Sequence, residues 1–137
     1  MRNLLDKVKK LFGFKSMSQK MEQGNPYLKI DESKTTQEQC ERLLLLEHLA
    51  HIEIIWDLQM RKDPYAIPYI KRAIFLKPHL AYLASEEDST YFKRCLWVLQ
   101  EIGTVEAINL IEEYTHSDKE ELAEQARYRI YRINGGT

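Results

Sequence analysis

The chain has few of the features that mark membrane or secreted proteins. Its longest apolar runs are short clusters such as the four leucines at 43–46, far below the roughly 20 residues that span a bilayer. The basic N-terminus is followed by neither an uninterrupted apolar segment nor a small-residue cleavage site, as a secretory signal would require. Its two cysteines, Cys40 and Cys95, fall inside helical patterns, which favours buried free thiols in a reducing compartment. We therefore expect a cytoplasmic protein.

Several signatures of catalysis are also missing. The five glycines are isolated except for one pair near the C-terminus, so they form no phosphate-binding loop, and no Gly-x-Ser-x-Gly occurs. Glu113 and His116 make a single Glu-x-x-His, whereas a di-iron carboxylate bundle needs two such motifs and two further glutamates. A cysteine nucleophile needs a nearby base and an electropositive, exposed position, and neither cysteine has that setting in the sequence. We expect no enzymatic activity and no cofactor.

The charge is unevenly distributed along a chain of 137 residues, a length that suits one domain. Residues 1–20 carry six basic side chains and one acidic side chain, a net charge of +5. The remaining residues carry 14 basic and 20 acidic side chains, a net charge of −6. A basic arm therefore precedes an acidic body, which speaks against the body as a general nucleic-acid binder.

The N-terminal arm has a helical apolar stripe. Over residues 1–14 the stripe comprises Leu4, Leu5, Val8, Leu11 and Phe12, with lysines on the other side. This helix could lie on an anionic membrane, dock on the rest of the chain or bind a partner. Residues 15–35 are polar and contain a turn signal at 24–26, so we interpret them as a linker, partly disordered.

Residues 36–134 predict an all-α domain of about five helices, because apolar residues recur at helical spacing and no segment alternates with period two. The capping and breaking residues set the boundaries. The expected helices run from Thr36 toward Met60, from Asp63 and Pro64 onward, from Asp88 or Ser89 to Ile102, from Thr104 to about Thr115, and from Ser117 or Asp118 to Ile133. In the second of these helices we expect Ile67, Ile70 and Ile74 to be buried, with Phe75 a further candidate. A longer connection with one short helical turn is expected at 77–87.

One pattern is written twice, 41 residues apart. The matching pairs are Trp56/Trp97, Leu58/Leu99, Gln59/Gln100, Ala66/Ala107, Ile67/Ile108 and Ile70/Ile111. A repeat of about 40 residues made of two amphipathic helices cannot bury its apolar faces alone, so neighbouring repeats must stack.

The repeated stretch resembles HEAT repeats, particularly the short bacterial kind found in phycobilin lyase-like proteins. Those proteins read A-x-x-A-L-x-x-I-G at the end of one helix and D-x-x-A-I-x-x-L-I at the start of the next. The matching positions are Cys95, Val98, Leu99, Ile102 and Gly103 in the first half and Thr104, Ala107, Ile108, Leu110 and Ile111 in the second. The upstream copy keeps Asp63, Ala66, Ile67 and Ile70 but has Lys62 where the pattern has glycine. Over residues 54–133 the resemblance implies a short right-handed α-solenoid of HEAT-like hairpins, and it says little about activity.

A candidate partner-binding surface lies on the last helix and on the equivalent helix of the preceding repeat. Its residues are Lys93, Arg94, Tyr128, Arg129 and Arg132, which we expect to lie largely outside the core. Arginine and tyrosine dominate binding hot spots. The alternative is a solvated face with salt bridges to Glu120, Glu121 or Glu124. The alternative binding surface is the exposed end near Trp56 and Trp97, if either ring lies outside the core; we assign both tryptophans to packing.

His48 and His51 are weak candidates for a metal site, because two imidazoles three residues apart on a helix can share a divalent ion. No convincing third ligand is near, so we favour a packing or surface role and predict no metal.

These observations favour a non-enzymatic adaptor that binds another protein, with a bacterial toxin-immunity or regulatory protein as a specific version. One alternative is a nucleic-acid-binding HEAT-like protein that uses a local basic patch; the acidic body makes this partner unfavourable. A second alternative is a chromophore lyase-like helper, although no residue demands a pigment.

Overall fold

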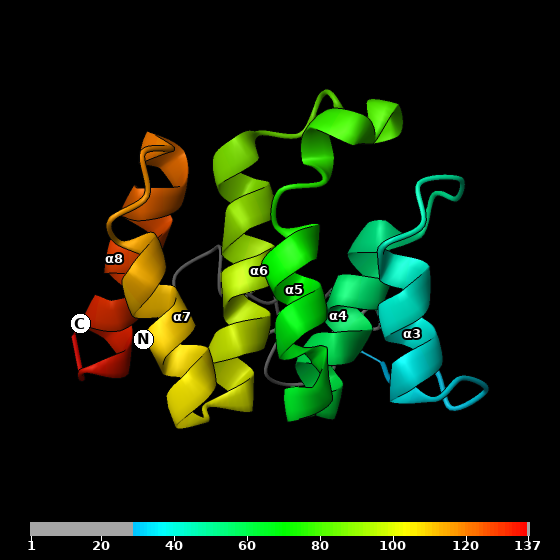
Figure 1. The fold of residues 1–137 in the computed structure, drawn as a ribbon, viewed down its shortest axis with the longest axis horizontal. Coiled ribbons are helices and arrows are strands. Elements are labelled where there is room, and N and C mark those ends of the chain that lie inside the picture. Colours follow the sequence, from blue (N-terminus) through cyan, green and yellow to red (C-terminus); the bar gives the residue numbers. More distant parts are fainter. Residues whose placement is uncertain (1–28, 137) are drawn as a thin grey trace, which may run out of the picture.

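The computed structural model of the protein describes residues 29–136 and is shown in Figure 1. Within this range the fold is all-helical and contains no strand. Its α-helices are α3 (Thr36–Leu43), α4 (His51–Arg61), α5 (Ile67–Ala73), α6 (Asp88–Ile102), α7 (Val105–Tyr114) and α8 (Glu120–Ile133). Three short 3-10 turns complete it: η1 (Pro64–Ala66), η2 (Lys77–His79) and η3 (Ala81–Leu83). The predictions for residues 1–14 and for 15–28 lie outside the described residues.

The helices follow one another in chain order along the longest dimension of the molecule (Figure 1). The central helix is α6, which packs against α4, α5, α7 and α8. At one end α3 contacts α4 and α5, and at the other α7 contacts α8. The contacts of α6 with both α4 and α8 place these three helices next to one another, and this row positions the candidate site described below.

A single apolar core runs through the described helices because each contributes a buried stripe. Ile67, Ile70 and Ile74 are buried as predicted, whereas Phe75 is exposed. Burying one leucine or isoleucine contributes about 1.5–3 kcal/mol, so this stripe alone holds α5 in place. Cys40 and Cys95 are free and fully buried, which confirms the packing role predicted from their helical positions.

The duplicated sequence pattern occupies equivalent positions in the structure. Leu58 and Leu99 are both fully buried, as are the pairs Ala66/Ala107 and Ile70/Ile111. Both tryptophans are half-buried. These three pairs therefore face the core in both copies, whereas Gln59 and Ile67 are buried and their counterparts Gln100 and Ile108 are only partly buried.

The predicted long helix from Thr36 toward Met60 is wrong: the structure divides it into α3 and α4. Helix α3 is capped by Thr35, one residue earlier than predicted, with the Thr35 side chain accepting from the Glu38 N–H and Glu38 reaching back to the Thr35 N–H. Residues 44–50 form a loop, in which Leu46 and Leu49, expected on the helical stripe, are exposed. The leucine-rich composition suits a helix here, but histidine hydrogen bonds described below satisfy the freed carbonyls instead.

Other boundaries follow the capping residues closely. Asp63 accepts a hydrogen bond from the Tyr65 N–H and begins η1, and Thr104 accepts from the Ala107 N–H and begins α7, both as predicted. The N-caps of α6 and α8 are Glu87 and Lys119, each one residue from a predicted cap. The predicted connection at 77–87 contains two short turns, η2 and η3, where one was expected.

In the part of the chain that the structure describes, no helix has the length and apolar character needed to cross a membrane.

Candidate protein-binding face

A row of aromatic and cationic side chains crosses α4, α6 and α8. We call it the cation–aromatic face and define it by Trp56 on α4, by Lys93, Arg94 and Trp97 on α6, and by Tyr128, Arg129 and Arg132 on α8. It contains all five residues predicted from the sequence, together with the two tryptophans that were assigned to packing.

The same kind of contact occurs where α4 meets α6 and where α6 meets α8, and we call these two boundaries the seams of the row. The Arg94 guanidinium carbon lies 5.3 Å from the centre of the Trp56 ring, so α6 reaches over α4. The Arg129 guanidinium carbon lies 4.6 Å from the centre of the Trp97 ring, so α8 reaches over α6. Cations within about 6 Å of an indole face are attracted by its negative potential. Each tryptophan is therefore covered by a cation from the next helix in the row.

Lys93 and Tyr128 extend the contact around Trp97. The Lys93 amine lies 5.8 Å from the Trp97 ring, and the Tyr128 ring lies 4.9 Å from the Arg129 guanidinium carbon. Arg132 donates a long hydrogen bond of 3.4 Å to the Tyr128 hydroxyl, and Tyr128 is 46% exposed. Two cations and two aromatic rings thus converge on one point of the surface.

The two arginines have different charge partners. Arg94 donates from Nε to the Glu86 carboxylate at 3.0 Å, in a pair that is about three-quarters buried. Arg129 donates from one terminal nitrogen to the Gln100 side-chain oxygen at 3.0 Å, and its buried Nε has no hydrogen-bond partner among the described residues. Within residues 29–136 Arg129 forms no ion pair with a carboxylate.

The prediction that Arg129 lies largely outside the core is therefore wrong, because this residue is only 5% exposed. Burial lowers the pKa of its guanidinium, since a charged group loses hydration there. The alternative of a salt-bridged solvated face does not describe Arg129 either: Glu120 pairs with Arg127 at 2.9 Å. The helical periodicity placed Arg129 outside the core but could not show that its guanidinium would pack over the Trp97 ring.

His48 and His51 have a structural role. Their rings stack at 4.0 Å with 14° between their planes. His48 Nε2 donates to the Arg42 carbonyl at 2.6 Å, and its Nδ1 accepts from the Ala50 N–H at 3.0 Å. This pattern requires a neutral ring with the proton on Nε2.

His51 has the same tautomer. Its Nε2 donates to the Leu45 carbonyl at 2.6 Å. The Tyr82 hydroxyl accepts from the His51 backbone N–H and therefore donates to His51 Nδ1 at 2.7 Å. All four ring nitrogens of the two histidines are thus engaged, and the two rings hold the carbonyl of Arg42 in the last turn of α3 and that of Leu45 in the following loop. Within residues 29–136 no three histidine, cysteine, aspartate or glutamate side chains form a group that could hold a metal ion.

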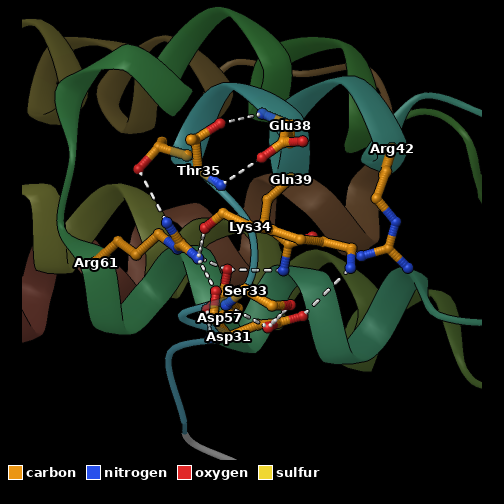
Figure 2. A network of polar contacts seen from close by, with 10 residues as sticks. Asp31, Ser33, Lys34, Thr35, Glu38, Gln39, Arg42, Asp57 and Arg61 are labelled. Atoms are coloured by element: carbon orange, nitrogen blue, oxygen red, sulfur yellow. Dashed lines mark hydrogen bonds and ion pairs between the residues drawn. The ribbon is translucent and has the colours of Figure 1, made fainter.

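A second polar network anchors the beginning of the described chain (Figure 2). Buried Asp57 accepts from the Asp31 N–H at 2.7 Å, from Gln39 at 2.9 Å and from Arg61 Nε at 2.7 Å. Arg61 also donates to the carbonyls of Asp31 and Lys34. Residues 31–34 are thereby fixed to α3 and α4, although the sequence places them in the linker.

Comparisons of the chain with models of protein families, with curated proteins and with solved structures find no match.

Proposed function

We propose that this chain is a non-enzymatic protein-binding module, built as a short right-handed HEAT-like solenoid, and that the cation–aromatic face holds the partner. The solenoid is supported by contacts between successive helices and by the equivalent burial of the two sequence copies. The binding role is supported most by Arg129, a buried cation without a carboxylate partner among the described residues.

A buried arginine that lacks a counter-ion is costly for folding. Desolvation of a charge costs several kcal/mol, and the ring contacts and the single Gln100 hydrogen bond recover only part of it. Such a cost is expected where a group serves binding, because a partner's carboxylate that reaches the guanidinium would complete its hydrogen bonds. We therefore propose that the partner presents an acidic side chain at this point.

The composition of the face fits a protein partner. Tryptophan, tyrosine and arginine are the residue types most enriched among binding hot spots, and here they are adjacent: Tyr128 is exposed, Trp97 half-buried and Arg129 buried. The net charge of −6 outside residues 1–20 opposes the sequence-independent binding of a phosphate backbone. A toxin-immunity or regulatory role is one way in which such a module would be used.

The experiment is co-purification from the native host with three baits: the full chain, Arg129→Met and the control Arg127→Met. Arg127 is an exposed arginine on the same helix that is paired with Glu120. We expect a partner on the full chain and on the control bait, and at least a tenfold weaker affinity for Arg129→Met once that partner is titrated. Equal retention by all three baits contradicts the proposal.

A second pair of baits separates the helical domain from the N-terminal arm. Because Asp31 and Lys34 are bonded to Asp57 and Arg61, the shorter bait begins at Lys29 and keeps these contacts. Partner retained on this bait supports the cation–aromatic face. Partner lost from it, with helicity unchanged, assigns binding to the arm and contradicts the proposal. Binding of duplex DNA at low salt, abolished by Arg129→Met, would replace a protein partner with nucleic acid.

A further inference from the structure

The loop between α3 and α4 presents three leucines to solvent. Leu45 is 58% exposed, Leu46 49% and Leu49 72%. We call residues 44–50 the leucine loop. Single exposed leucines are common on protein surfaces, but three within five residues form an apolar cluster of the kind that marks an interaction site.

The leucine loop is held in this exposed arrangement by the two histidines. His51 is fully buried and its ring bonds to the Leu45 carbonyl, while the His48 ring bridges the Arg42 carbonyl and the Ala50 N–H. These bonds fix the backbone on both sides of Leu46. His51 is buried and His48 half-buried while the neighbouring leucines are exposed, which reverses the usual distribution and costs stability unless something covers the leucines.

The surroundings of the leucine loop are acidic. Glu47 lies within the loop and is exposed, and Glu53 follows on the first turn of α4. Tyr82, bonded to His51 and 37% exposed, borders the cluster, and the carboxylates of Glu53 and Glu86 lie close enough to raise the pKa of its hydroxyl, after the larger effect of burial. A complementary occupant needs an apolar stripe flanked by basic side chains.

We propose that residues 2–12 of this same chain dock on the leucine loop. Their sequence supplies an apolar stripe at helical spacing and three lysines, Lys7, Lys9 and Lys10, in a segment of net charge +5 over residues 1–20. This inference does not depend on the proposed function, since the leucine loop and the cation–aromatic face are formed by different residues.

The length of the intervening chain permits this docking. Residues 13–28 separate the stripe from the first described residue, and 16 residues reach up to about 50 Å when extended. Asp31, which is fixed to Asp57, precedes α3, and the leucine loop follows α3. Because the eight residues of α3 span about 12 Å, the tether is long enough to reach the leucine loop. A tether of this length gives an effective concentration in the millimolar range, which favours the chain's own segment over a second copy at micromolar protein.

The test uses the full chain with a nitroxide at a cysteine introduced by Lys9→Cys, and it measures paramagnetic broadening of leucine and valine methyl signals. We expect the methyl signals of Leu45, Leu46 and Leu49 to lose more than half of their intensity. The methyl signals of Val105, which is 76% exposed on α7, should be unchanged. Raising the salt from 50 mM to 500 mM should reduce the effect, because exposed charges are screened.

The variant Leu46→Ser/Leu49→Ser should abolish the broadening at Leu45, whereas Val105→Ser should leave it intact. Leu46, Leu49 and Val105 are all exposed, so the remaining methyl spectrum reports whether the fold is kept. Broadening that is absent, or that falls on α6 and α8 instead, overturns the proposal. Broadening that appears equally when labelled chain is mixed with unlabelled isotope-enriched chain assigns the leucine loop to a second copy and also overturns it.

Discussion

Lys62 and Gly103, 41 residues apart, end α4 and α6 in the same left-handed conformation. Lys62 has a φ of 54° and donates to the Leu58 carbonyl, and Gly103 has a φ of 69° and donates to the Leu99 carbonyl. The next residue that caps is also equivalent, Asp63 in one copy and Thr104 in the other. The two sequence copies therefore share a helix ending that only one of them encodes with glycine.

This relationship predicts that Lys62→Gly stabilises the protein by about 1 kcal/mol, because a side chain in the left-handed region is strained by roughly that amount. The exposed Lys62–Glu101 contact at 3.6 Å offsets little of the gain. Gly103→Ala should destabilise by a similar amount. Urea unfolding at pH 8 measures both changes, and a lower midpoint for Lys62→Gly would contradict the equivalence of the two endings.

Arg129→Met is expected to leave folding stability unchanged or to raise it by about 1 kcal/mol. The substitution removes a buried cation without a carboxylate partner among residues 29–136, and methionine keeps much of the apolar contact with Trp97. The same substitution should weaken partner binding. A loss of more than 2 kcal/mol in urea unfolding would show that Arg129 serves the fold and would remove the main support for the cation–aromatic face.

Asp57→Ala is expected to destabilise the protein by about 3–5 kcal/mol. It removes the acceptor of three hydrogen bonds and leaves Arg61, with a side chain only 10% exposed, without its carboxylate. Hydrogen exchange should show early loss of protection at the backbone N–H groups of Lys34 and Gln39. Glu101→Gln, which breaks a surface pair, is the control and should change stability by less than 1 kcal/mol.

Stability should fall as the pH is lowered from about 6.5 toward 5. Burial holds the pKa of His51 below its ordinary value, so the unfolded chain binds a proton in this range that the folded chain does not. The His51→Gln variant should be less stable than the unchanged protein at pH 8, but its free energy of unfolding should fall by less between pH 6.5 and pH 5. If the free energy of unfolding of the two proteins changed in parallel with pH, the pH dependence would not come from His51.

A separate acid effect should appear at lower pH. Hydrogen bonds from Ser33 hold the pKa of Asp31 below its ordinary value, and hydrogen bonds from Thr35 do the same for Glu38. Both carboxylates contribute stability that is present above about pH 4 and is lost as they are protonated below it. Thr35→Ala should reduce this acid step because it removes the hydroxyl that accepts from the Glu38 N–H and so loosens the capping box.

The two cysteines should resist thiol reagents while the protein is folded. Burial raises the pKa of both Cys40 and Cys95 to about 12, so neither forms a thiolate at pH 8. Absorbance with a disulfide reagent should therefore stay flat in buffer and rise to two equivalents in urea. Rapid reaction in buffer would show that α3 or α6 opens readily.

The sequence predicted the helical content because its apolar spacing and capping residues agree over α6, α7 and α8. The prediction failed at 44–50, where consecutive leucines suit a helix but hydrogen bonds from His48 and His51 to backbone carbonyls hold the chain in a loop instead. The His51 ring is held in turn by the Tyr82 hydroxyl, 31 residues further along the chain, and no local pattern reveals such a partner.

The candidate site was only partly readable for the same reason. Helical periodicity placed Tyr128 and Arg132 on the outside, where they lie, but it could not reveal that Arg129 packs over the Trp97 ring and is buried there. The 41-residue echo of Trp56 and Trp97 was the available signal: a bulky aromatic at matching positions of two repeats marks a shared contact between successive helices.

Because Trp56 and Trp97 each lie beneath a cation from the next helix, the protein carries an optical reporter at either seam of the row. With Trp97→Phe the remaining indole follows the separation of α4 from α6, and with Trp56→Phe it follows that of α6 from α8. Shifts of the tryptophan fluorescence during denaturation would then show whether α8 separates from α6 before the other helices unfold or whether all described helices unfold in one cooperative step.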